Sequence, residues 1–195
     1  MKKIISIFAV LFCATALSAQ VKGLEANFTH TRTAAGVTEK DSGKIYYAAP
    51  SSLAIRSAAP SKDLIVIDGT SVYIRRDGRE RRFNTTKNAP MRSMSATLLN
   101  CVKCDTHKVA DENDADIQVQ KFARSTDVVI TARKKAVRGY FRIELSYRKS
   151  DGLLQYMKLT EFNGNVNEYK MTGFVQSATL PADAFAIPAK TSRSE

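Results

Sequence analysis

The fold is decided by one stretch of the sequence, GKIYYAAPSSLAIRSAAPSKDLIVIDGTSVYIRR, which spans residues 43–76. It contains four short runs rich in β-branched and aromatic residues, at 43–48, 52–57, 63–68 and 71–76, separated by prolines or an aspartate-glycine pair. β-Branched and aromatic side chains favour strands. An Asp-Gly pair tolerates the positive φ that a tight hairpin turn requires. The stretch therefore predicts four consecutive antiparallel strands.

The same pattern continues on both sides of this stretch. Its clearest instance is YFRIELSYR at residues 140–148, where apolar and polar side chains alternate with a period of two, as in a half-buried antiparallel strand. Further strands are predicted at 26–32, 116–123, 128–132, 153–162 and 165–174. We therefore expect about ten strands joined mostly by hairpins.

One segment departs from this pattern. Pro90 precedes residues 91–100, in which Met94, Leu98 and Leu99 recur at helical spacing. A lone amphipathic helix must cover an apolar surface. Many strands with one helix predict a mainly β domain, a single strongly curved antiparallel sheet with a helical plug. Such a sheet encloses either a ligand space or a packed core, and periodicity does not distinguish the two.

The N-terminus has the pattern of a secretory signal peptide. Lys2 and Lys3 precede an apolar run at 4–17, and small residues end the segment. The apolar run is too short to span a bilayer. We expect a signal peptide at 1–19, export to the periplasm, and one domain at 20–195.

The chain is strongly basic, with a formal net charge of +11. Such a charge favours an anionic partner, either nucleic acid or an acidic membrane or protein surface. Export argues against nucleic acid, so none is expected as a partner. The basic residues are scattered along the strands apart from one cluster, Arg75, Arg76, Arg79, Arg81 and Arg82. This cluster is either a solvated hairpin rim or a docking surface.

Two cysteines have the spacing Cys-x-x-Cys, at Cys101 and Cys104. In an oxidising compartment this spacing favours a short-loop disulfide at the end of the predicted helix. A zinc site that adds His107 and a fourth ligand, Asp105 or Asp111, is an alternative. A redox-active dithiol is a third interpretation, although no thioredoxin-like context surrounds the pair.

Other signatures of catalysis are absent from the sequence. It contains no Gly-x-Ser-x-Gly, no phosphate-binding glycine loop and no His-Glu-x-x-His. The acidic pairs at 111–112 and 114/116 lie in a polar, loop-like stretch and are either solvated or a weak calcium site. We therefore predict a protein that is not an enzyme and that needs no cofactor or metal.

The order of the motifs resembles that of a known family. LIVIDGTSVY at 64–73 is similar to the family's ILVSDG element and the aromatic residue after it, and residues 26–28 are similar to its Ala-x-Phe element. Ala-Pro-Met at 89–91 lies where the family has Thr-Pro-Phe before a helix, and residues 185–188 match its Phe-x-x-Pro. On these residues the chain resembles the periplasmic outer-membrane lipoprotein carriers of the LolA type.

The resemblance implies an unclosed, half β-barrel with a helical lid over an apolar cavity. It implies a monomeric periplasmic chaperone that accepts lipoproteins from an inner-membrane ABC transporter and passes their acyl chains to an outer-membrane acceptor. The cavity wall would comprise Phe28, Ile45, Tyr47, Leu53, Ile55, Leu64, Val66, Tyr73, Phe141, Ile143 and Leu145. The lid would comprise Met91, Met94, Leu98 and Leu99.

The sequence also departs from the family pattern. Only residues 20–25 precede the Ala-x-Phe element, where the family has a longer helix, and His30 replaces a glutamine. Ala49 lies at the position of the family's gate arginine, and Arg56 follows seven positions later. Two alternatives therefore stay open: a lipid-binding or envelope adaptor protein of the same fold, and a thiol-disulfide protein.

Overall fold

The computed structural model describes residues 22–177 and 179–188, so the predicted signal peptide lies outside the described residues. Two helices follow the first six strands, α1 (Ala89–Val102) and α2 (Thr106–Glu112). The strands are β1 (Gly23–Ala34), β2 (Val37–Ala48), β3 (Ser52–Ser57), β4 (Leu64–Asp68), β5 (Ser71–Arg76), β6 (Arg79–Asn84), β7 (Ala115–Lys121), β8 (Ser125–Ala132), β9 (Tyr140–Arg148), β10 (Leu154–Glu161) and β11 (Val166–Gln176).

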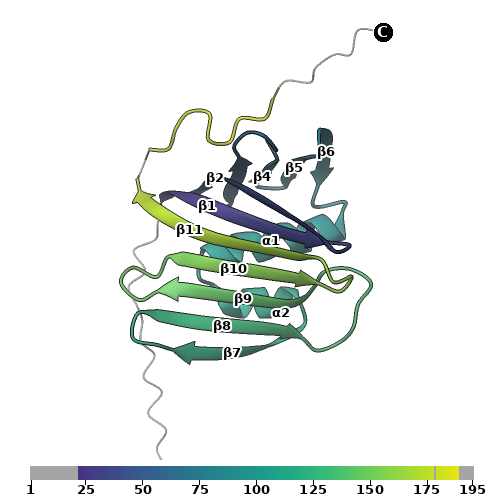
Figure 1. Cartoon of the computed structure of the whole chain (residues 1–195), viewed down its shortest axis with the longest axis vertical. Helices are drawn as coiled ribbons and strands as arrows, with labels where there is room; N and C mark the ends of the chain where they lie inside the picture. Colours follow the sequence, from purple (N-terminus) through teal and green to yellow (C-terminus); the bar gives the residue numbers. More distant parts are fainter. Residues whose placement is uncertain (1–21, 178, 189–195) are drawn as a thin grey trace, which may run out of the picture.

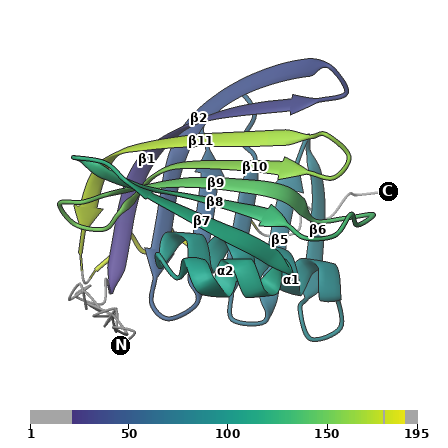
Figure 2. The same ribbon diagram turned by 90° about the horizontal axis from the view of Figure 1, so that it is seen from below.

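All the strands form one antiparallel sheet in the order β6-β5-β4-β3-β2-β1-β11-β10-β9-β8-β7. The strands at its two edges, β6 and β7, are not paired with each other, so the barrel is unclosed. The chain builds one half of the sheet as hairpins, crosses below it through α1 and α2, and builds the other half from the opposite edge (Figure 1). Figure 2 shows the sheet curled around the two helices, which lie on its concave side. The predicted fold class is confirmed.

Apolar side chains form two clusters, one on each face of the sheet. The inner cluster lies between the concave face and the helices. The outer cluster lies on the convex face of β2–β5 beneath the C-terminal segment, residues 179–188. The alternation within β4 shows the division, because Ile67 belongs to the inner cluster and Ile65 packs against it, whereas Leu64 and Val66 belong to the outer one. Burial on both faces explains the unbroken apolar run of this strand.

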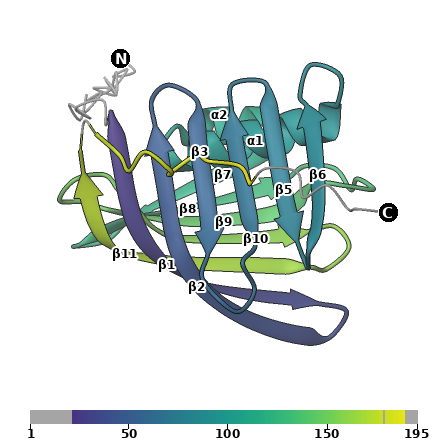
Figure 3. The same ribbon diagram turned by 90° about the horizontal axis from the view of Figure 1, so that it is seen from above.

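The C-terminal segment is held on the sheet by Arg56, from β3. Its guanidinium donates hydrogen bonds to the main-chain oxygens of Ala184, through Nε at 2.8 Å, and Asp183, through Nη2 at 2.8 Å. Nη2 also donates to the main-chain oxygen of Ala186. Figure 3 shows the segment crossing the outer face of the sheet. Arg56 therefore fastens the cover of the outer cluster and faces away from the helices.

Two elements differ from the sequence predictions. β6 was not predicted, because its sequence RERRFN is mostly charged and lacks apolar alternation. It pairs with β5 along its whole length and forms an exposed edge, where arginines discourage pairing with other chains. Helix α2 was not predicted either, and it includes the start of the stretch that the sequence predicts as loop-like. Its seven residues are too few to show a clear helical period in the sequence.

In the described part of the chain, neither helix is long and apolar enough to cross a membrane.

Candidate functional site

Helix α1 covers the centre of the concave face. It begins where the Asn88 side chain accepts a hydrogen bond from the Met91 amide at 3.1 Å, with Pro90 in the first turn. Leu98 is 4% exposed and belongs to the inner cluster together with Leu99. Of the other two predicted lid residues, Met94 packs against the cluster partly buried, and Met91 is half-buried outside it.

Helix α2 extends the cover toward β7 and β8. Its buried Val109 and Ala110 join the inner cluster. The Asn113 side chain amide donates to Thr97 Oγ1 at 2.9 Å and to the main-chain oxygen of Val109 at 2.7 Å. Because Thr97 belongs to α1, these bonds join the two helices into one lid. The signal for α2 in the sequence is Asp105, the N-cap residue. Its carboxylate accepts a hydrogen bond from the Lys108 amide at 3.4 Å.

Most predicted wall residues lie on the concave face. Seven of them belong to the inner cluster: Phe28, Ile45, Tyr47, Leu53, Ile55, Ile143 and Leu145. The prediction missed further buried members on the strands after the helices, namely Val128, Ile130, Tyr147, Met157, Leu159, Tyr169 and Met171. These residues recur at a period of two along β8–β11, and this alternation in the sequence could have identified them.

Four predicted wall residues lie elsewhere, which corrects their assignment. Leu64, Val66 and Tyr73 belong to the outer cluster, because they alternate with the inward-facing residues of β4 and β5. Phe141 is 46% exposed. The register of β9 against β10 shifts between Thr160 and Glu161, so Phe141 is an extra residue in a β-bulge, and Tyr140 packs against the inner cluster in its place.

The lid is also tied to the wall by one buried hydrogen bond. The hydroxyl of Tyr147, from β9, donates to the main-chain oxygen of Cys101 at the end of α1, at 2.9 Å. Burial raises the pKa of this hydroxyl well above its ordinary value, so it stays a neutral donor. The bond satisfies one carbonyl of the last helical turn inside an apolar environment.

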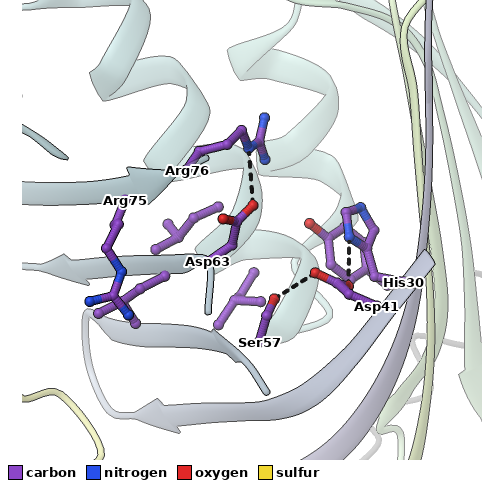
Figure 4. Close-up of a pocket in the computed structure, with 10 residues that line it drawn as sticks. His30, Asp41, Ser57, Asp63, Arg75 and Arg76 are labelled. Carbon is purple, nitrogen blue, oxygen red and sulfur yellow. Dashed lines mark hydrogen bonds and ion pairs between the residues drawn. The ribbon is translucent and has the colours of Figure 1, made fainter. Parts of the chain in front are cut away.

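A small polar pocket of about 20 Å³ lies at one end of the inner cluster (Figure 4). Ile55, Ile65 and Tyr169 of that cluster line one side of it. Leu64 also lines the pocket, and its other lining side chains are polar or charged: His30, Asp41, Ser57, Asp63, Arg75 and Arg76. Its volume is enough for about one water molecule. We call it the polar pocket.

Hydrogen bonds connect the side chains of the polar pocket. Asp41 accepts from Ser57 Oγ at 2.7 Å and lies 3.1 Å from Nδ1 of His30 (Figure 4). The other ring nitrogen of His30, Nε2, lies 3.2 Å from the side-chain oxygen of Asn167. Ser57 thus bonds to the carboxylate rather than to the imidazole. An imidazole must contact a serine hydroxyl to activate it as a nucleophile, so this arrangement is not that of a serine hydrolase.

Burial raises the pKa of two acidic groups in the polar pocket, the Tyr169 hydroxyl and the Asp63 carboxyl. It raises the pKa of Tyr169 to about 12, and the Tyr169 ring stacks on His30 with centroids 4.2 Å apart. Burial also raises the pKa of Asp63, although the Asp77 amide at 3.2 Å and Arg76 at 3.7 Å favour its ionised form. The pocket therefore offers both donors and acceptors next to an apolar interior.

The two cysteines are free thiols, so the predicted disulfide is not formed in the structure. Cys101 is buried in the inner cluster, whereas Cys104 is exposed beyond the helix at φ 60°. Burial raises the pKa of both thiols, and this disfavours the thiolate that redox catalysis requires. In residues 22–177 and 179–188, no group of three possible metal ligands comes together, which leaves the zinc interpretation without a site.

We expect the two thiols to differ in reactivity. In the native reduced protein without residues 1–19, iodoacetamide labels Cys104 slowly at neutral pH, about tenfold faster for each pH unit of increase below its raised pKa. Cys101 stays unlabelled until the protein unfolds, because it is buried. Intact-mass measurement over time checks this, with Cys104→Ser as the control. Labelling of Cys101 as fast as Cys104 contradicts the prediction.

An open antiparallel sheet wrapped around an apolar helical lid defines the class of the molecule as a lidded half-barrel. A family model described as "Outer membrane lipoprotein carrier protein LolA" matches residues 19–188. The chain therefore belongs to the LolA family, as the sequence motifs indicated.

Three solved structures match the chain, and the one with a TM-score above 0.5 is similar to it in fold. An uncharacterized conserved protein from Thermus thermophilus is 11% identical with a TM-score of 0.52, covering 87% of this chain and 88% of that one. A putative outer membrane lipoprotein-sorting protein domain from Vibrio parahaemolyticus is 10% identical with a TM-score of 0.42, covering 84% and 88%. The Mycobacterium tuberculosis lipoprotein LppX is 5% identical with a TM-score of 0.42, covering 84% and 92%. No curated protein matches the chain.

Proposed function

We propose that this protein is a periplasmic carrier that binds the acyl chains of lipoproteins between its sheet and its helices. The observation that carries the proposal is the nature of the cover: the concave apolar face is closed by two helices rather than by a second sheet. These helices join the sheet by connections at both ends, so they can move away while the sheet stays paired. Membership of the LolA family supports the same function.

Energetics favour a carrier whose lid occupies its own binding site. An acyl chain of about 16 carbons in water is unfavourable by roughly 0.8 kcal/mol for each exposed CH₂, or about 12 kcal/mol in all. A permanently open cavity would hold such a chain too tightly to release it. Leu98 and Leu99 fill the interior of the empty protein, so bound cargo replaces lid contacts of similar strength. The net affinity is then small enough for transfer.

The polar pocket supports an orientation for the cargo. It adjoins the apolar interior and carries both signs of charge, with Arg76 and Asp63 facing each other. In the proposed complex the acyl chains lie under the lid, and the polar part of the lipid lies toward this pocket. An inner-membrane ABC transporter as donor and an outer-membrane acceptor complete the proposed route.

Native mass spectrometry tests the proposal. We expect the protein purified from cells to carry lipoprotein or phospholipid adducts that mild organic extraction removes. We also expect the extracted protein to bind a triacylated peptide and to ignore the same peptide without acyl chains. Binding of neither peptide, or equal binding of both, contradicts acyl-chain carriage and favours an adaptor that docks proteins through its basic surface.

A further inference from the structure

The connection between β8 and β9, residues 133–139, has the sequence RKKAVRG and contains four basic residues in seven. Val137 near its end is 93% exposed. An aliphatic side chain this exposed between cations makes no contribution to folding through burial. The connection therefore carries an apolar group and positive charge together on the surface.

A groove of about 460 Å³ lies beside this connection. Phe141 and Phe162 form part of its wall, with ring centroids 6.0 Å apart in an edge-to-face arrangement. The Phe162 amide donates to the main-chain oxygen of Gly139 at 3.3 Å, which holds the β10–β11 turn against the β8–β9 connection. Figure 1 shows both segments at the same end of the sheet. The β-bulge that turns Phe141 outward thus creates an aromatic wall on the surface.

The basic residues of the connection divide into two kinds. Arg133 donates to Asp116 at 2.7 Å and to Asp114 at 3.2 Å, and Lys134 lies 3.7 Å from Asp114. Two others, Lys135 and Arg138, have no ion pair within residues 22–177 and 179–188. The paired residues therefore fix the base of the connection, and the two unpaired cations flank Val137.

We propose that this end of the molecule docks on an anionic phospholipid bilayer. Val137 enters the interface between headgroups and acyl chains, Lys135 and Arg138 meet lipid phosphates, and the two phenylalanines rest at headgroup level. Exposed apolar groups mixed with cations match such an interface. A nucleic acid or an acidic peptide would complement the charge only and would leave Val137 in water. A second exposed aliphatic residue, Val37, follows the β1–β2 turn at the same end of the sheet, where β1 pairs with β11. This docking is independent of acyl-chain carriage.

Vesicle flotation of the protein without residues 1–19 tests the docking. We expect binding to vesicles of phosphatidylcholine with about one third phosphatidylglycerol, little binding to phosphatidylcholine alone, and release at high salt. Replacing both unpaired cations, K135Q with R138Q, lowers the affinity about 25-fold, since each basic residue near the surface contributes about fivefold. Val137→Ser lowers it by a further factor of about five. Circular dichroism shows whether these variants stay folded.

The matched control is the pair R79Q and R81Q on the exposed edge strand β6, which makes the same change in charge. We expect it to change vesicle binding less than about twofold. Equal binding to neutral and anionic vesicles, no binding to either, or an equal loss in the control pair overturns the proposal. Soluble glycerol phosphate is expected to weaken binding no more than sodium chloride of the same ionic strength. A selective effect would mean that the groove takes free phosphate, which also overturns bilayer docking.

Discussion

Leu98→Ala lowers the free energy of unfolding by about 2–5 kcal/mol and, at the same time, raises the affinity for a long-chain acyl ligand about tenfold to a hundredfold. The loss of stability follows from burial, because Leu98 fills the inner cluster from α1. The gain in affinity follows from linkage. In the proposed mechanism cargo displaces the lid, so weaker lid contacts destabilise the empty protein and leave the loaded one unchanged. Denaturant unfolding and titration with a fluorescent acyl probe measure the two effects.

The matched control is Ile143→Ala on the wall. Ile143 is 1% exposed in the same cluster, so a similar loss of stability is expected. Its contacts with cargo are lost as well, and the affinity therefore falls. The two variants are therefore expected to change the affinity for the acyl ligand in opposite directions, up for Leu98→Ala and down for Ile143→Ala. If Leu98→Ala weakens binding as Ile143→Ala does, α1 is a fixed part of the core and the proposed lid mechanism is wrong.

Arg56→Ala lowers the free energy of unfolding by about 2–4 kcal/mol, because it removes charge-assisted hydrogen bonds to three main-chain oxygens at once. It also frees residues 179–188 from the sheet. The outer cluster then becomes accessible, including Leu64, Val66 and Tyr73. We expect increased binding of the dye ANS and rapid proteolysis within residues 179–188 under native conditions.

Two further variants sharpen this test. Arg56→Lys keeps the charge but lacks the planar fork, so it restores only part of the stability. Arg142→Ala removes an arginine from a single partly exposed pair with Glu144 and changes stability by less than about 1 kcal/mol. A stability of Arg56→Ala within about 0.5 kcal/mol of the parent protein, without ANS binding, contradicts the role assigned to Arg56.

The hairpins were predictable because their signals are local. Turn residues and period-two alternation lie within a few positions of each other, and the strands at 52–57 and 71–76 were predicted with the bounds that the structure shows. The helical position of Leu98 and Leu99 was predictable for the same reason, since helical spacing is a local property. β6 was missed because an edge strand depends on the backbone of β5 and not on its own apolar residues.

The remaining site residues depend on contacts between distant parts of the chain. The assignment of Leu64 and Val66 to the inner face was wrong because a cover more than a hundred positions later buries the other face. The assignment of Phe141 to the wall was wrong because of a β-bulge, which can be located only from the pairing of β9 with β10. For Cys101, the spacing to Cys104 says nothing about which of the two side chains enters the core.

The central pairing of β1 with β11 joins the first strand of the sheet to the last. During synthesis, the hairpins from β1 to β6 can form early, but β1 gains its second neighbour only after the last strand has been made. Closing so long a loop is entropically unfavourable and slows folding. Until then β1 is an unpaired edge that other strands can join. Shortening the chain before β11 is therefore expected to produce aggregates rather than a smaller folded domain.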